Sequence, residues 1–114
     1  MKIIDVKNQI SRNELEKIAK KMFGNLVKAV VDIEKEIIAV DAELHSDEEA
    51  KLIEQGSKQN NLWGINLYPE FKDENFVEFD SMINLRPSQN NRSRGVDDPK
   101  IQEKIRVIVK KLMK

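Results

Sequence analysis

Residues 26–44, LVKAVVDIEKEIIAVDAEL, read as two strands joined by a tight turn. Residues 26–33 and 36–44 are both rich in β-branched side chains, which favour strands. Only Glu34 and Lys35 separate them, and this pair lacks the Asn-Gly chemistry that two-residue turns prefer. The stretch therefore predicts an antiparallel β-hairpin.

Helix signals lie on both sides of this hairpin. Upstream, Ser11 and Glu14 form an S-x-x-E capping box, which predicts a helix beginning at Arg12. Downstream, Ser46 and Glu49 form a second capping box, which predicts a short helix after the hairpin.

Three further strands and a last helix complete the pattern. Strands are predicted at residues 3–6, 62–68 and 76–86, and a proline closes each of the last two. Asp98 as N-cap and Pro99 at the first helical position predict the last helix. The element order is therefore β-α-β-β-α-β-β-α.

The first six elements match the split β-α-β, or ferredoxin-like, pattern, with a strand and a helix added at the end. We therefore expect a single α+β domain over residues 1–114. It should be a two-layer sandwich, in which three helices cover one face of a mostly antiparallel sheet. Strand alternation places one apolar set on the covered face, namely Val27, Ala29, Val31, Ile33, Ile38, Val40, Ala42, Leu44, Trp63, Ile65, Leu67, Val77, Phe79, Ile83 and Leu85.

The composition is typical of a soluble globular protein. Hydrophobic residues make up 39% of the 114 residues and charged residues 35%. Basic and acidic residues both number 20, so no net field attracts nucleic acid or an acidic membrane. There is no cysteine, which excludes disulfides and thiolate sites. Since no apolar run is long enough for a signal peptide or a membrane span, we expect a cytoplasmic location and no membrane partner.

The opposite face of the predicted sheet is polar, and no helix is left to cover it. Its charged residues are mixed with Val30, Ile37, Phe76 and Met82. Such a face is either a solvated surface with salt bridges, or the binding site of a ligand or a second subunit. Because a second copy would bury the apolar side chains, we expect a homodimer.

Residues 86–95, RPSQNNRSRG, carry three guanidinium groups, three carboxamides and two hydroxyls. Arginine side chains bind phosphate or carboxylate in bidentate fashion, which favours an anion-binding loop. The alternative is a flexible loop whose arginines pair with nearby carboxylates. With polar residues of the sheet, the predicted ligand-binding set is Arg86, Asn90, Asn91, Arg92, Arg94, Asn66, Tyr68 and Asn84.

Carboxylates and the single histidine form a second candidate site. Asp41, Glu43 and His45 alternate along one strand, and Glu78 and Asp80 along another, so a straight strand projects each set from one face. Such ligands could hold a divalent metal that activates water. In so charged a chain the spacing also arises without a function, and the histidine could simply end its strand.

The chain resembles a family of uncharacterised prokaryotic proteins of about this length, classed as a domain of unknown function. The likeness is carried by LWGINLYP at residues 62–69 and by EFDSMINLRPSQNNRSR at residues 78–94, and includes VKAVVDI and DAELHSD. The resemblance implies no activity, ligand or catalytic residue.

Two hypotheses about function follow. The first is a non-enzymatic binding or regulatory module that needs no cofactor and captures an anionic, phosphate-bearing small molecule or nucleic acid. The alternative is a metal-dependent phosphoester hydrolase that uses the carboxylate and histidine cluster.

Overall fold

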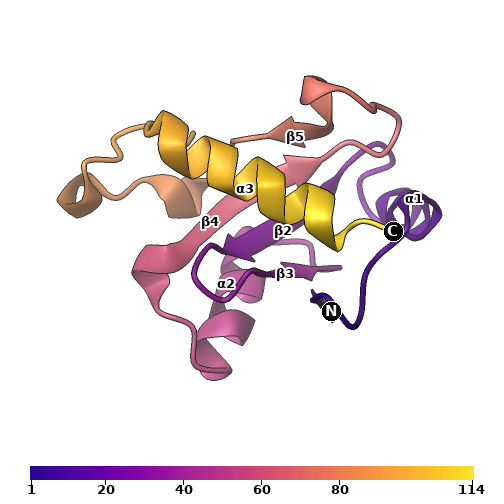
Figure 1. Cartoon of the computed structure of the whole chain (residues 1–114), viewed down its shortest axis with the longest axis horizontal. Helices are drawn as coiled ribbons and strands as arrows, with labels where there is room; N and C mark the ends of the chain where they lie inside the picture. The colour runs from indigo at the N-terminus through magenta and orange to yellow at the C-terminus, as the bar shows by residue number, and fades with distance from the viewer.

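Five strands form one open antiparallel sheet in the computed structural model of the chain, which describes residues 1–114 (Figure 1). The strands lie in the order β1-β3-β2-β4-β5. They are β1 (Lys2–Ile4), β2 (Val27–Asp32), β3 (Ile37–Val40), β4 (Leu62–Leu67) and β5 (Val77–Glu78). The α-helices are α1 (Arg12–Lys21), α2 (His45–Glu54) and α3 (Pro99–Leu112), and none of them is long and apolar enough to span a membrane.

The predicted hairpin is confirmed as β2 and β3. Its turn is held by the buried side chain of Asp32, whose Oδ1 accepts hydrogen bonds at 2.9 Å from the backbone N–H groups of Glu34 and Lys35. The Oδ2 atom accepts a hydrogen bond from the Ser57 hydroxyl at 2.6 Å. These bonds fix a turn that lacks Asn-Gly chemistry.

The capping box predicted for α1 is also confirmed. The Ser11 hydroxyl accepts a hydrogen bond from the Glu14 backbone N–H at 3.1 Å, and the Glu14 carboxylate accepts one from the Ser11 backbone N–H at 3.3 Å. Beyond the helix, Gly24 has a φ angle of +91°, which only glycine adopts freely. The helix therefore begins where the sequence predicts, at Arg12.

The larger hydrophobic core lies between the sheet and helices α1 and α3. Most of the side chains that strand alternation predicted to be apolar line it, but Leu44 of that set is exposed and lies away from this core. Burial of each such side chain contributes about 1.5–3 kcal/mol to stability. The strand residues in this core are Val27, Ala29, Val31, Ile38, Val40, Trp63, Ile65, Leu67 and Val77.

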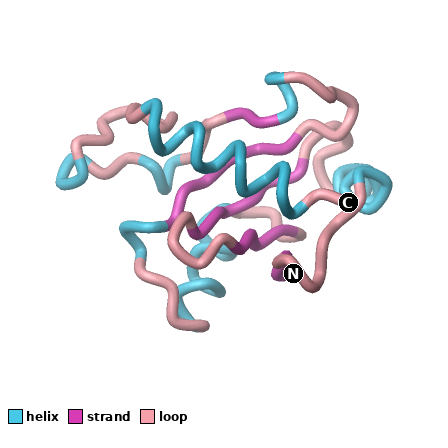
Figure 2. Tube along the Cα trace, in the orientation of Figure 1, coloured by secondary structure: helices cyan, strands magenta, loops and turns pink.

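Helix α2 lies on the opposite face of the sheet, so the prediction of three helices on one face is wrong. Leu52 of α2 forms a second, smaller core with Val30, Ala39 and Leu62, which point away from the first core. In Figure 1, α3 crosses in front of the strands and α2 lies behind them. Figure 2 shows the strands passing between these two helices. The molecule thus has helices on both faces rather than two layers.

Connection rules explain this arrangement. Strands β1 and β2 run parallel with β3 between them, and β3 and β4 run parallel with β2 between them. The connection through α1 leads from β1 to β2, and the connection through α2 leads from β3 to β4. Both move across the sheet in the same direction, but they start from strands that run in opposite directions. Right-handed crossovers of this kind place α1 and α2 on opposite faces. The ferredoxin-like topology, with both helices on one face, is not confirmed.

The predicted strand at residues 76–86 is much shorter in the structure, where β5 ends at Glu78. The Asn84 side chain takes over the pairing with β4, since its Oδ1 accepts from the Gly64 N–H at 2.8 Å and its Nδ2 donates to the Gly64 carbonyl at 2.9 Å. Side-chain alternation therefore fails beyond this point. Leu85 is exposed, and Ile83 packs against the smaller core rather than the larger one.

Candidate functional site

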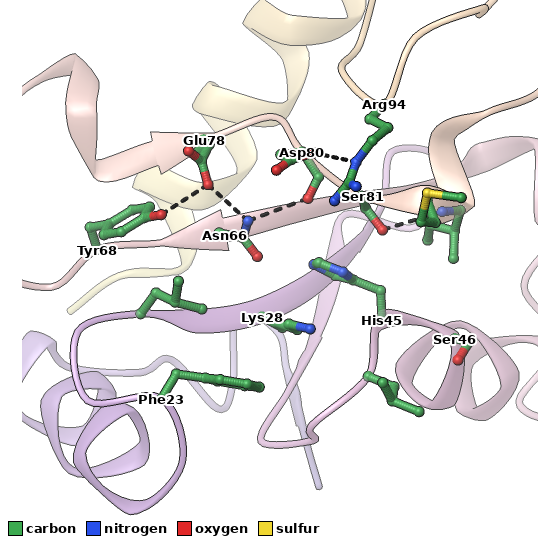
Figure 3. A pocket seen from close by; sticks show the side chains of 14 residues that line it. Phe23, Lys28, His45, Ser46, Asn66, Tyr68, Glu78, Asp80, Ser81 and Arg94 are labelled. Atoms are coloured by element: carbon green, nitrogen blue, oxygen red, sulfur yellow. Dashed lines mark hydrogen bonds and ion pairs between the residues drawn. The ribbon is translucent and has the colours of Figure 1, made fainter.

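Helix α2 covers only half of its sheet face, and the other half opens into a pocket of about 550 Å³ (Figure 3). We call it the polar pocket. Lys28 of β2, Asn66 of β4 and Glu78 of β5 line it from the sheet. The remaining lining residues are Phe23, Leu26, Leu44, His45, Ser46, Tyr68, Asp80, Ser81, Met82, Ile83 and Arg94.

The N-terminus of α2 forms one wall of the polar pocket. The helix begins at His45 with Leu44 as its N-cap, so the predicted capping box of Ser46 and Glu49 is wrong. No side chain caps this end, and the backbone N–H groups of His45 and Ser46 make no hydrogen bond within the chain. The helix end therefore presents two free N–H donors to the pocket wall, while Asp47 in the first turn offsets part of its positive charge.

His45 turns inward from the first helical position, and its side chain is buried. Its Nε2 lies 2.7 Å from the Ile65 carbonyl oxygen. A carbonyl can only accept, so Nε2 carries a proton and the neutral ring keeps Nδ1 as an acceptor. Burial lowers the pKa of His45, against the opposing effect of the bond to Ile65. The ring is therefore neutral at pH 7.

Lys28 brings an unneutralised positive charge to the pocket. Its Nζ lies 4.9 Å from the centre of the Phe23 ring, and no carboxylate lies within 4.0 Å of it. Its charge contributes to the lowered pKa of His45, which places the ammonium group near the start of α2. In Figure 3 the Lys28 side chain extends toward His45.

Two carboxylates line the other side of the pocket, and each is held by neighbours. The Glu78 Oε1 accepts hydrogen bonds at 2.9 Å from the Asn66 Nδ2 and from the Tyr68 hydroxyl. Burial, with the bond to Glu78, raises the pKa of Tyr68. The Asp80 Oδ1 pairs with the Arg94 Nε at 2.7 Å. The pocket is therefore cationic beside α2 and acidic beside β5.

A family model described as "Protein of unknown function (DUF5674)" matches residues 3–112. The chain belongs to this family. The match confirms the family membership that the sequence indicated, and it spans every residue of the polar pocket. No curated protein and no solved structure matches the chain.

Three of the eight residues predicted to bind a ligand in this DUF5674 chain line the polar pocket, namely Asn66, Tyr68 and Arg94. Asn90 and Arg92 are exposed on the loop and do not line it. The remaining three serve the fold through bonds within the chain.

Arg86 stacks on the only tryptophan. Its guanidinium carbon lies 4.2 Å from the centre of the Trp63 ring, and its terminal nitrogens donate to the carbonyls of Gln59 and, at 2.6 Å, of Leu62. Burial lowers the pKa of Arg86. The guanidinium thus ties the 86–95 loop to the sheet instead of facing the polar pocket.

Asn84 and Asn91 are buried and organise the same loop. Besides its two bonds to Gly64, Asn84 donates to the Arg94 carbonyl at 2.9 Å. The Asn91 Nδ2 donates to the carbonyls of Asn84 at 2.7 Å and Gly95 at 2.8 Å. These carboxamides satisfy buried backbone groups, so the 86–95 loop is an ordered support that positions Arg94.

The five predicted metal ligands do not come together, and no group of three or more histidine or carboxylate side chains is close enough to hold a metal ion. His45, Glu78 and Asp80 line the polar pocket, whereas Asp41 and Glu43 do not. Asp41 instead pairs with the Lys21 Nζ at 2.9 Å and the terminal ammonium at 3.7 Å. The prediction failed because β3 ends at Val40 and the residue after it, with a φ angle of 71°, breaks the strand alternation.

Two charged residues that matter here, Lys28 and Glu48, were not among the site residues predicted from the sequence. Lys28 is the single basic residue within β2, which was the available signal. Glu48 of α2 is completely buried, its carboxylate oxygens have no hydrogen-bond partner, and burial raises its pKa to about 10. The segment SDEEA at residues 46–50 gave no sign of this burial, because it is typical of the exposed first turn of a polar helix.

Proposed function

We propose that this DUF5674 protein is a binding module that captures a small, phosphate-bearing molecule in the polar pocket. The observation that carries the proposal is the unpaired Lys28 ammonium beside the uncapped N-terminus of α2. A helix N-terminus with free backbone N–H groups favours phosphate, and a nearby ammonium group strengthens that preference.

The other side of the pocket constrains the rest of the ligand. Glu78 and Asp80 would repel a second anionic group, so a continuous polyanion such as nucleic acid fits poorly. Hydroxyl or ammonium groups suit these carboxylates as hydrogen-bond donors. A volume of about 550 Å³ is in the range of small-molecule sites. The ligand class is therefore a phosphate monoester that carries hydroxyl or amino groups.

Arg94 supports this proposal from the rim of the pocket. Its Nε is engaged by Asp80, but its terminal nitrogens make no hydrogen bond within the chain. They are available to a ligand without the cost of breaking an internal bond. The neutral His45 adds an acceptor in Nδ1 rather than a third full charge.

Phosphoethanolamine is a direct probe, since its phosphate suits Lys28 and α2 and its ammonium group suits Glu78. Isothermal titration calorimetry on the full chain should show binding to the wild type and at least about tenfold weaker binding to Lys28→Met. The variant keeps the aliphatic stem and removes only the charge. Lys17→Met, an exposed change on α1, is the matched control and should bind like the wild type. Equal affinities of the two variants would contradict the proposal.

The proposal concerns one copy of the chain. Val30 and Phe76 are buried in the single copy, which removes most of the argument for the predicted homodimer. Met82 stays 62% exposed, and it lines the polar pocket. The homodimer and the cytoplasmic location stay predictions from the sequence.

A further inference from the structure

A second concave site, of about 300 Å³, lies on the side of the sheet that α1 and α3 cover, away from the polar pocket. We call it the basic groove. It runs between the start of α1, the connection before β5, and the last turns of α3. Four cationic side chains and a single carboxylate line it, namely Arg12, Lys72, Arg106, Lys110 and Asp73.

The two arginines are held in place by contacts that do not neutralise their positive charge. The Arg12 guanidinium carbon lies 4.7 Å from the centre of the Phe76 ring, and its Nη1 donates to the carbonyls of Pro69 at 2.6 Å and Phe71 at 2.8 Å. Carbonyls and aromatic rings orient a guanidinium without neutralising it. Nε and Nη2 of Arg12 make no hydrogen bond within the chain.

Arg106 repeats this arrangement from α3. Its guanidinium carbon lies 5.0 Å from the centre of the Phe79 ring, and its Nη1 donates to the Glu74 carbonyl at 3.2 Å. The two guanidinium groups are thus positioned before any ligand arrives, which lowers the entropic cost of binding.

None of the four cations has a carboxylate within 4.0 Å. Lys72 and Lys110 are exposed, and Asp73 uses its Oδ1 to cap the short 3-10 helix that begins after it. The chain carries no net charge, so this excess of positive charge is a local feature. A concave site lined by one sign of charge attracts oppositely charged ligands.

The floor of the basic groove is apolar. Phe76, Val77 and Val109 are buried beneath it, and Met113 is half-buried at its end. Inorganic phosphate would leave this surface uncovered. An anion with an apolar substituent would satisfy the cations and cover the floor together.

We propose that the basic groove binds an organic anion, a phosphate or carboxylate attached to an aryl or alkyl group. The anionic group contacts Arg12, Arg106 and Lys110, and the apolar group lies over Val77 and Val109. This site is independent of the function proposed for the polar pocket, because it uses other residues on the other side of the sheet.

Phenyl phosphate tests the proposal in an amide NMR titration of the full chain. The expected result is a saturable shift at Val77, Val109 and Met113, with affinity higher than that of inorganic phosphate. Lys110→Glu should weaken binding about tenfold without unfolding the chain, since this side chain is exposed and unpaired. Lys104→Glu is the control, because it makes the same charge change on the same helix outside the groove.

Three results would overturn the proposal. Equal weakening by the two variants would assign the effect to net charge. Shifts confined to His45 and Ser46 would place phenyl phosphate in the polar pocket instead. Equal affinity for phenyl phosphate and inorganic phosphate would remove the role of the apolar floor.

Discussion

Glu48 is a carboxyl group buried without a partner, and its titration should govern how stability depends on pH. Burial raises its pKa from the ordinary value of 4.5 to about 10. Between these values the folded state holds a proton that the unfolded state releases. The contribution of the protonated Glu48 to stability is therefore fully present below pH 4.5. It decreases as the pH rises toward 10, by at most about 1.4 kcal/mol per pH unit.

Glu48→Gln should remove this loss, because the amide has the same shape and does not titrate. We expect the variant to match the wild type at pH 4 and to be more stable by roughly 3 kcal/mol at pH 7, 2.5 pH units above the ordinary pKa. Urea unfolding at both pH values measures the difference, and Glu54→Gln, an exposed change on the same helix, should have no effect. If the difference in stability between Glu48→Gln and the wild type is no larger at pH 7 than at pH 4, Glu48 is ionised in the folded state.

At the scale of elements, the close packing of residues 79–84 against β4 supports one side of the polar pocket. Gly64 lies where this segment crosses the strand, and a Cβ built there would lie 2.5 Å from the Ser81 Cβ and 2.6 Å from its Oγ. The Asn84 carboxamide can pair with the Gly64 backbone only at this short separation. The glycine is therefore required by the approach of a neighbouring segment.

Gly64→Ala should destabilise the fold by about 1–3 kcal/mol, the usual cost of overpacking. Ser81→Gly removes the two closest atoms, so the double variant should lose less stability than the sum of the single variants. Urea denaturation of the four proteins completes the cycle. Strict additivity of the two changes would mean that the segment already lies further from β4.

Local sequence patterns predicted helices and strands correctly where residues close in sequence satisfy each other's hydrogen bonds. The Ser11 capping box of α1 and the β2–β3 hairpin depend on residues close in sequence, and both are confirmed. The predicted start of α2 was wrong because a tertiary contact determines it, since the His45 side chain turns inward to the Ile65 carbonyl. The predicted end of β5 was wrong because the Asn84 side chain, rather than a continuing strand, pairs with the backbone of β4. Side-chain alternation in the sequence gives no sign of such a substitution.

Across the whole molecule, a polar sheet face could be predicted from the sequence, but not that α2 covers half of it. Strand alternation correctly separated Lys28 and Asn66 from the larger core. Assigning α2 to a face required the strand order, and that order follows from long-range pairing rather than from local pattern. Once α2 covers Val30, Ala39 and Leu62, only the half of the face around Lys28 stays open.

The proposed function requires that this open half binds phosphate at the start of α2. Amide NMR during a titration with phosphoethanolamine tests it most directly, because the backbone N–H groups of His45 and Ser46 are the predicted donors. We expect the largest saturable shifts at these two amides and near Lys28, and their loss in Lys28→Met. Saturable shifts that leave His45 and Ser46 unchanged, or no saturable shift at any amide, would rule out phosphate binding at the start of α2.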